Sequence, residues 1–525
     1  MSMSPQAAEA ARRRTFAIIS HPDAGKTTLT EKFLLYAGAV QSAGTVKARS
    51  GRRSATSDWM EMEQKRGISI SSTVLQFPYR GGTVNLLDTP GHRDFSEDTY
   101  RVLAAVDAAV MVLDVAKGIE PQTRKLFEVC RDRGIPLLTF LNKLDRPGRE
   151  PLELLDEIGD QLGLIPTPVT WPVGIPGDFR GVVDRRDGSF VRFTKAARGA
   201  SEAAEEVVDP AEAAQQEGGA WEAAQEELAL LSASGNDLDV ESFLGGVSTP
   251  VFVGSALTNF GVRLLLDAVV DLAPAPSPVP DEEGKPRDLD APFAGFVFKI
   301  QANMDPAHRD RIAFVRVCSG HFRRGMTVTH AASGKPFATK YASTVFGADR
   351  ETIEEAFPGD VIGLVNATGL GIGDTLYEAD PVRFPRIPSF APEQFVVARP
   401  LDGGRFKQFR RGLAQLDEEG VVQVLRHVDR GDAAPILAAV GPMQFEVFSH
   451  RLEHEFGAPV ELLGTSYKVA RRTDSASAAA LTRSTGVEVL ARADGTLLAL
   501  FESPAWLARV EQDKPELTLE RIIAD

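Results

Sequence analysis

Five consecutive residues, Asp88, Thr89, Pro90, Gly91 and His92, have the composition of a segment that handles phosphate. They follow the apolar run 84–87, which predicts a buried strand, so Asp88 stands at a strand end where it can reach a metal ion through water. Gly91 lacks a side chain, and its N–H can therefore approach a terminal phosphate closely. His92 comes next in the chain, where its side chain can contact the nucleophile that attacks that phosphate. Turn geometry alone could also select these residue types, so the assignment depends on further motifs.

A second segment has the pattern of a phosphate-binding loop. It lies between the apolar run 16–19 and a helical pattern, and it matches G-x-x-x-x-G-K-[ST] except that Ser20 replaces the first glycine. Successive backbone N–H groups at a helix N-terminus can hold phosphates. Lys26 would reach the β- and γ-phosphates. The alternative is a chance loop. The predicted nucleotide contacts are Ser20, His21, Pro22, Asp23, Ala24, Gly25, Lys26, Thr27 and Thr28.

Two later segments predict selection of guanine. Asn142, Lys143, Leu144 and Asp145 follow the apolar run 137–141. The Asp145 carboxylate can accept hydrogen bonds from N1–H and the exocyclic amine of guanine, whereas adenine would leave it unpaired at a large cost. A polar turn after a strand is the structural alternative.

A weaker match follows the predicted strand 250–253. There, Ser255, Ala256 and Leu257 would support the base through backbone N–H groups.

Three residues could hold Mg²⁺. The Thr27 hydroxyl follows the loop lysine, and Asp88 would act through water. Ser69, in the segment 66–70, would become a ligand only when the γ-phosphate is present, although a polar strand start is an equally good explanation. The predicted catalytic residues are His92, which would orient the attacking water, and Lys26, which would stabilise charge on the transferred phosphoryl group.

The order of these segments carries more weight than any one of them. The segments follow one another in the order of a doubly wound GTPase: the phosphate loop, the hydroxyl segment 66–70, the metal and γ-phosphate segment 88–92, and the guanine segment 142–145. Each of the strong motifs also follows a predicted strand. The sequence therefore predicts binding of GTP and GDP with Mg²⁺. No arginine is obviously placed to stabilise the transition state, so we expect slow intrinsic turnover.

Length and composition predict a multidomain protein. The chain has 525 residues, which suggests about three domains, and its 43% hydrophobic and 25% charged residues are typical of globular proteins. Two cysteines distant in sequence favour a reducing cytoplasm. The net charge is −15, and 12 acidic residues without lysine or arginine fall within 201–250. This one segment supplies most of the excess negative charge. The acidic total is therefore a weaker argument against a nucleic-acid partner than it would be if the charge were spread over the chain.

The patterning predicts three domains of different class. Residues 1–280 should form an α/β P-loop GTPase domain with an acidic helical insertion at about 196–245. A proline-rich linker, 274–280, precedes alternating strands that predict a small β-barrel domain over 281–385. Residues 386–525 should form an α+β C-terminal domain with two amphipathic helices.

Together these motifs resemble the translational GTPases. Residues 88–92 look like the switch signature of that superfamily, and residues 441–445 resemble the third domain of elongation factor G. The match is closest to the release factor 3 branch, on the octapeptide 20–27, the segment 58–63, and Ser69, where elongation factors usually carry threonine.

The resemblance implies a ribosome-dependent GTPase of translation termination. Its partners would be the ribosome and class I peptide release factors, whose dissociation and recycling it would promote, as a cytoplasmic monomer without membrane association. The alternative within the superfamily is a truncated translocation GTPase of the elongation factor G type, although the two further domains of such a factor would have no room before residue 525. Two alternatives lie outside the translational GTPases: a P-loop kinase or nucleotidyl transferase, and a non-enzymatic protein that senses GTP.

Overall fold

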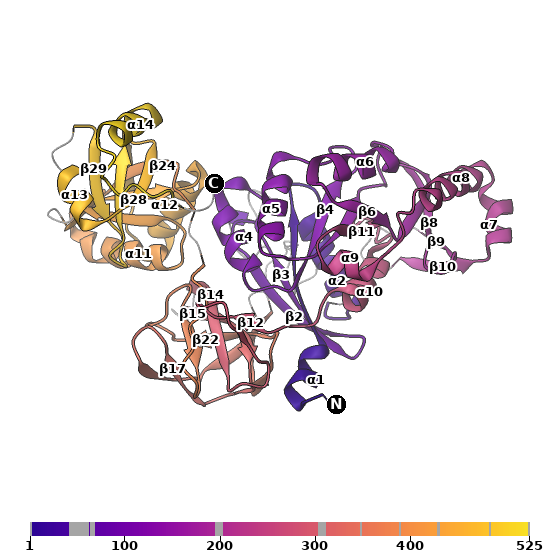
Figure 1. The fold of residues 1–525 in the computed structure, drawn as a ribbon, viewed down its shortest axis with the longest axis horizontal. Helices are drawn as coiled ribbons and strands as arrows, with labels where there is room; N and C mark the ends of the chain where they lie inside the picture. Colours follow the sequence, from indigo (N-terminus) through magenta and orange to yellow (C-terminus); the bar gives the residue numbers. More distant parts are fainter. Residues whose placement is uncertain are drawn as a thin grey trace.

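The computed structural model describes residues 3–40, 62–63, 69–194, 203–302, 311–346, 349–387, 390–427, 431–481 and 485–522. The predictions for residues 58–61 and 66–68 therefore lie outside the described residues. Three parts follow one another along the chain, an α/β part, a β part and an α+β part, in the predicted order (Figure 1). In the described part, every helix is too short or too polar to cross a membrane.

The first part is built on a sheet of seven strands in the order β2-β3-β1-β4-β5-β11-β6. Only β2 runs antiparallel to its neighbour, as expected for a doubly wound fold with one reversed edge strand. The strands are β1 (Arg13–Ser20), β2 (Thr73–Tyr79), β3 (Gly82–Asp88), β4 (Ala108–Asp114), β5 (Leu137–Asn142), β6 (Ile165–Pro168) and β11 (Ser248–Val253).

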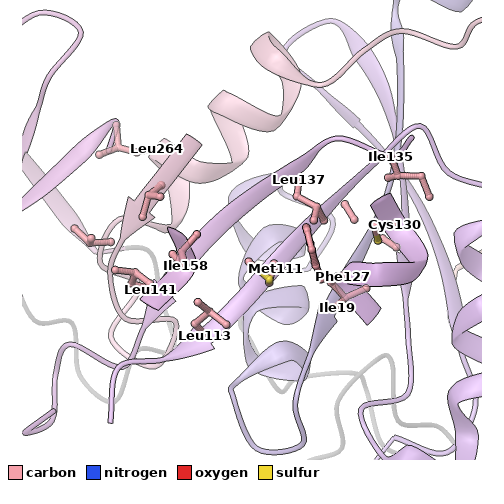
Figure 2. Close-up of a cluster of buried hydrophobic side chains, with 14 of the residues drawn as sticks. Ile19, Met111, Leu113, Phe127, Cys130, Ile135, Leu137, Leu141, Ile158 and Leu264 are labelled. Carbon is pink, nitrogen blue, oxygen red and sulfur yellow. The ribbon is translucent and has the colours of Figure 1, made fainter. Parts of the chain in front are cut away.

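Helices cover both faces of this sheet, which explains why its strands are apolar on both sides. On one face, Met111 of β4 and Leu141 of β5 belong to the same buried cluster as Phe127, Cys130 and Ile158 of the covering helices (Figure 2). The other face packs against the remaining long helices. The helices are α1 (Pro5–Ala11), α2 (Lys26–Tyr36), η1 (Arg93–Phe95), α4 (Ser96–Leu103), α5 (Pro121–Asp132), α6 (Pro151–Leu162) and α10 (Val262–Leu272).

The acidic region belongs to a larger unit than a helical insertion. Its long helix, 219–233, packs on an antiparallel sheet that begins at Thr170, with Trp171 and Trp221 buried, and the helix 210–217 packs on the long helix. Figure 1 shows this unit at the end of the molecule opposite the C-terminal part. Its elements are β7 (Thr170–Ile175), β8 (Asp178–Asp184), β9 (Phe190–Thr194), β10 (Ala204–Val208), α7 (Pro210–Glu217) and α8 (Gly219–Ala233). Helix α9 (Val240–Leu244) follows this unit and packs on β11 of the central sheet.

The second part is barrel-like. An eight-stranded sheet, in the order β18-β17-β23-β14-β15-β22-β19-β20, surrounds its own apolar core, and two short strand pairs accompany it. The strands are β12 (Val279–Pro280), β13 (Pro286–Arg287), β14 (Ala294–Ala302), β15 (Arg311–Ser319), β16 (Phe322–Arg323), β17 (Thr327–His330), β18 (Lys335–Ala338), β19 (Ala342–Phe346), β20 (Asp349–Thr352), β21 (Glu355–Ala356), β22 (Val361–Val365) and β23 (Thr375–Tyr377).

The third part has a seven-stranded sheet, β27-β24-β26-β25-β29-β30-β28, with helices packed on it. The predicted apolar stripes are buried, for example Phe409 and Leu413 on one helix and Phe448 and Leu452 on the other. Its elements are β24 (Gln394–Pro400), η3 (Gly403–Arg405), α11 (Phe406–Glu418), β25 (Gln423–His427), β26 (Gly431–Ala439), α12 (Pro442–Phe456), β27 (Val460–Gly464), β28 (Val469–Thr473), α13 (Ser475–Leu481), β29 (Val487–Ala491), β30 (Leu497–Phe501) and α14 (Pro504–Asp513).

Buried ion pairs join the first part to the barrel. Arg13 Nε lies 2.7 Å from Asp360 Oδ2, and Arg316 Nη2 lies 2.6 Å from Asp107 Oδ2. These arginines are almost fully buried, so loss of either carboxylate would leave an uncompensated charge at this contact.

Candidate nucleotide site

The predicted segments meet in one cavity of about 290 Å³ at the carboxyl ends of the parallel strands. Ligands of open α/β sheets bind at this edge. Residues from the phosphate loop, the hydroxyl segment, the γ-phosphate segment and both base segments contribute to its wall. The lining residues are Ser20, His21, Pro22, Asp23, Gly25, Lys26, Thr27, Thr28, Ser69, Gly91, His92, Lys143, Asp145, Arg146, Ala256 and Leu257.

Other predicted contact residues lie behind this wall instead. Ala24, Leu144 and Ser255 are buried, and so are Thr89 and Pro90. The Thr89 hydroxyl donates to the carbonyl of Ile18, 2.7 Å away, and thereby ties the γ-phosphate segment to β1. In the structure these side chains hold the loops in place, which leaves the loop backbone and the lining side chains to face the cavity.

Asn142 is the side chain that joins the phosphate loop to the base segments. Its Nδ2 donates to the carbonyl of Ala24 over 2.8 Å, and its Oδ1 accepts from the backbone N–H of Ala256 over 2.8 Å. Gly25 sits against it with φ +103°, and a Cβ at Gly25 would lie 2.3 Å from Asn142 Nδ2. Only glycine fits there, because both the backbone angle and the close approach exclude a side chain.

The base end of the cavity is organised by Asp145. Ser255 Oγ donates to Asp145 Oδ1 over 2.6 Å and fixes the carboxylate, while Arg146 Nε lies 3.7 Å from its other oxygen. Lys143 Nζ lies 2.8 Å from Asp114 Oδ2 and also donates to the carbonyl of Asp23. Sequence reasoning missed Asp114, although its position at the end of β4, next to β5, is a signal that could have found it.

The oxygen groups near the phosphate loop fit a hard divalent cation. Thr27 Oγ1 and Ser69 Oγ are 3.3 Å apart, and Lys26 Nζ lies 3.0 Å from Asp88 Oδ1. Asp88 Oδ2 is buried and has no hydrogen-bond partner among the described residues. Hydroxyl and carboxylate oxygens are ligands that Mg²⁺ takes, together with substrate phosphates and water. Within the described ranges, no group of three or more His, Cys, Asp or Glu side chains offers a separate metal site.

His92 stands at the edge of the cavity with its side chain 33% exposed. Its Nδ1 accepts a hydrogen bond from the backbone N–H of Asp94, 3.2 Å away. The neutral ring therefore carries its hydrogen on Nε2. Gly91 lies against the phosphate loop, because a Cβ there would be 3.3 Å from the Cα of Pro22.

Two further residues near the cavity were not singled out in the sequence. Glu120 Oε1 lies 3.1 Å from His21 Nε2, and burial nevertheless lowers the pKa of His21. Asp94 Oδ2 accepts from the backbone N–H of Met443, 2.8 Å away, at the start of α12. The residue that fixes His92 thus also contacts the third part. A pairing across 349 positions leaves no local signal in the sequence.

Comparison with known families covers each part in turn. Residues 11–275 match the family described as elongation factor Tu GTP binding domain, residues 292–379 match elongation factor G domain 2, and residues 384–511 match the class II release factor RF3 C-terminal domain. Proteins named peptide chain release factor 3 from Microcystis aeruginosa and Gloeobacter violaceus are 51% and 50% identical to the chain. The alignments cover 97% and 99% of this chain and 95% and 99% of those proteins.

The chain belongs to the peptide chain release factor 3 family. It is a translational GTPase that binds GTP and GDP, and the predicted order of α/β, barrel and α+β domains is confirmed. The release factor 3 C-terminal domain favours this family over a truncated translocase. A crystal structure of a protein from Thermus thermophilus is similar to 88% of this chain, over 69% of its own, with 26% identity and a TM-score of 0.70.

Proposed function

We propose that this member of the release factor 3 family hydrolyses GTP on the ribosome and promotes dissociation and recycling of class I peptide release factors. The observation that carries the proposal is the single cavity lined by residues of all the predicted GTPase segments, in a chain with the release factor 3 C-terminal domain. The relatives named peptide chain release factor 3 support the place of this activity in termination.

In this proposal the guanine lies against Asp145 and the backbone of 255–257, and the phosphates lie on the loop 20–28. Asp145 accepts from guanine in the orientation that Ser255 fixes. Lys26, which pairs with Asp88 in the structure, would place its ammonium group on the β- and γ-phosphates. We assign the domain limits 1–280, 281–385 and 386–525 to the GTPase, barrel and C-terminal domains, with the short strand β12 at the first boundary, where it pairs with β13 of the barrel.

Thr27 and Ser69 would hold Mg²⁺ with their hydroxyls, and Asp88 would act through water. The ion would neutralise charge on the phosphates. The buried and unpartnered Asp88 Oδ2 supports this assignment, because a buried carboxylate oxygen without a donor is costly unless something else satisfies it.

His92 would position the water that attacks the γ-phosphorus. Because Nδ1 is occupied by the N–H of Asp94, Nε2–H is free to donate to the water oxygen. The water oxygen forms the new bond to phosphorus while the bond to the β,γ-bridging oxygen breaks. One proton of the water stays on the inorganic phosphate and the other passes to solvent, which leaves GDP and inorganic phosphate as products. Among the described residues that line the cavity, the arginine is Arg146, at the base end beside Asp145. In this proposal the ribosome supplies the final alignment at the γ-phosphate.

Partners and location belong to the same proposal. We place the protein in the cytoplasm as a monomer that binds the ribosome and meets class I release factors there. The two cysteines, Cys130 and Cys318, are buried and free, which suits a reducing compartment.

Phosphate release from GTP and from ATP, each with and without ribosomes, tests this proposal. We expect slow release from GTP alone, a large increase with ribosomes, and little release from ATP. Equal use of ATP would favour a kinase-like or general nucleotidase activity. GTP binding without any ribosome-stimulated release would identify a GTP sensor and overturn the proposal.

A further inference from the structure

A lysine of the barrel reaches out of its own domain to the segment next to Ser69. Lys299 lies on β14, and its side chain is 5% exposed. Its Nζ donates to Ser71 Oγ over 2.8 Å, to Ser72 Oγ over 2.9 Å and to the carbonyl of Ser72. An ammonium group has three N–H donors, so these contacts use all of them on a pair of neighbouring residues in the first part.

The buried ammonium group of Lys299 depends on residues 71–72 for its hydrogen-bond acceptors. The carboxylate oxygen Asp98 Oδ2 is 4.0 Å away, and the barrel contributes the ring of Phe314 at 6.0 Å. Burial lowers the pKa of Lys299, and Asp98 opposes that effect. A buried charge is tolerated only when it is paired or hydrogen-bonded. If residues 71–72 moved away, the ammonium group would lose all three of these acceptors.

The same short segment is held from other directions. Asp98 Oδ2 accepts from the backbone N–H of Ser72 over 2.6 Å. Glu63 Oε1 accepts from the N–H groups of Ile70 and Ser71 over 2.9 and 3.1 Å. Ser69, whose hydroxyl lies 3.3 Å from that of Thr27, is therefore followed directly by residues whose positions are fixed.

We propose that Lys299 is a positioning residue that anchors residues 71–72 and thereby places the Ser69 hydroxyl beside the phosphate loop. This inference rests on the proposed function, in which Ser69 is a ligand of Mg²⁺, and on the expectation from the sequence that it binds the ion only when a γ-phosphate is present. Through this contact between Lys299 and residues 71–72, the position of the barrel depends on which nucleotide is bound. Release of Ser69 after hydrolysis weakens the bonds that satisfy Lys299, so the barrel loses this contact with the first part and keeps the ion pairs of Arg13 and Arg316.

Lys299→Met tests this anchor, because methionine keeps the length and apolar stem of the side chain and removes its donors. We expect the affinity for a non-hydrolysable GTP analogue with Mg²⁺ to fall about tenfold, as for the loss of hydrogen bonds to a charged group, and the GDP affinity to change less than about twofold. Deuterium uptake by a peptide covering 69–79 should rise in the analogue-bound protein. The matched control is Lys335→Met, an exposed lysine on β18 of the same sheet, which should change neither quantity.

Ser71→Ala provides a test that leaves the barrel untouched. It removes one acceptor of Lys299 and should lower analogue affinity by about threefold, with no added loss when it is combined with Lys299→Met. Equal losses for the analogue and GDP, or unchanged affinities in both single variants, would refute the anchor alone. A wild-type protein that bound neither nucleotide would instead refute the proposed function, and the anchor with it.

Discussion

At the scale of single residues, the sequence predicts which groups could act but not what holds them. The types and spacing of Lys26, Thr27, Asp88 and His92 follow from the needs of phosphate chemistry. The hydrogen bond from the N–H of Asp94 that sets the His92 tautomer depends on the loop conformation after β3, which no periodicity encodes. The unpartnered oxygen of Asp88 is likewise visible only once its surroundings are folded.

Replacement of His92 should separate binding from catalysis. His92→Ala is expected to lower ribosome-stimulated GTP hydrolysis by about 100-fold or more, because the group that orients water is lost. GTP affinity should stay within about twofold, since the phosphate loop and base segments are intact. Single-turnover phosphate release and nucleotide titration measure the two quantities, with His454→Ala, an exposed histidine on α12, as the control. A wild-type stimulated rate would remove His92 from the mechanism.

Asp145 should determine the choice of base. Asp145→Asn replaces an acceptor of two guanine donors by an amide that repels one of them, so GTP affinity should fall by about 100-fold. Xanthosine triphosphate, which presents a carbonyl where guanine has an amine, should bind the variant better than the wild type. Competition titration with both nucleotides measures the change. Retained preference for GTP would show that the backbone of 255–257, and not Asp145, selects the base.

At the scale of helices and strands, the sequence predicts the central sheet well because both of its faces are buried. The apolar runs 16–19, 84–87, 109–113, 137–141 and 250–253 all lie in β1, β3, β4, β5 and β11, and the motifs follow them. The sheet β7–β10 was not predicted. Its strands β7–β9 lie before the acidic segment 201–250, and their short apolar runs do not distinguish a separate antiparallel sheet from further strands of the central sheet.

The contact between η1 and α12 should affect catalysis through His92. Asp94→Ala removes the acceptor of the Met443 N–H at the start of α12, and we expect ribosome-stimulated hydrolysis to fall about tenfold with GTP affinity unchanged. Asp94→Asn keeps an acceptor oxygen and should restore most of the rate. Measurement of kcat and of the ribosome concentration at half-maximal rate distinguishes a positioning role from weaker ribosome binding. An alanine variant with the wild-type kcat would show that α12 does not act on His92.

At the scale of the whole molecule, the three parts meet around the nucleotide-dependent segments. The barrel contacts residues 71–72 through Lys299, and the third part contacts Asp94 through Met443. Arg101 of α4 also approaches Gly420, where a Cβ would lie 2.0 Å from its guanidinium group. The sequence predicts that these parts exist, since each has its own pattern. It does not predict their contacts, because residues hundreds of positions apart share no local period.

The central claim is that hydrolysis of GTP by this protein recycles class I release factors. The most direct test is a multiple-turnover termination assay in which a class I release factor is limiting. With GTP, addition of the protein should accelerate peptide release in later turnovers and leave the first turnover unchanged, and the His92→Ala variant should not accelerate it. Absence of GTP-dependent acceleration, or movement of peptidyl-tRNA instead, would contradict the account.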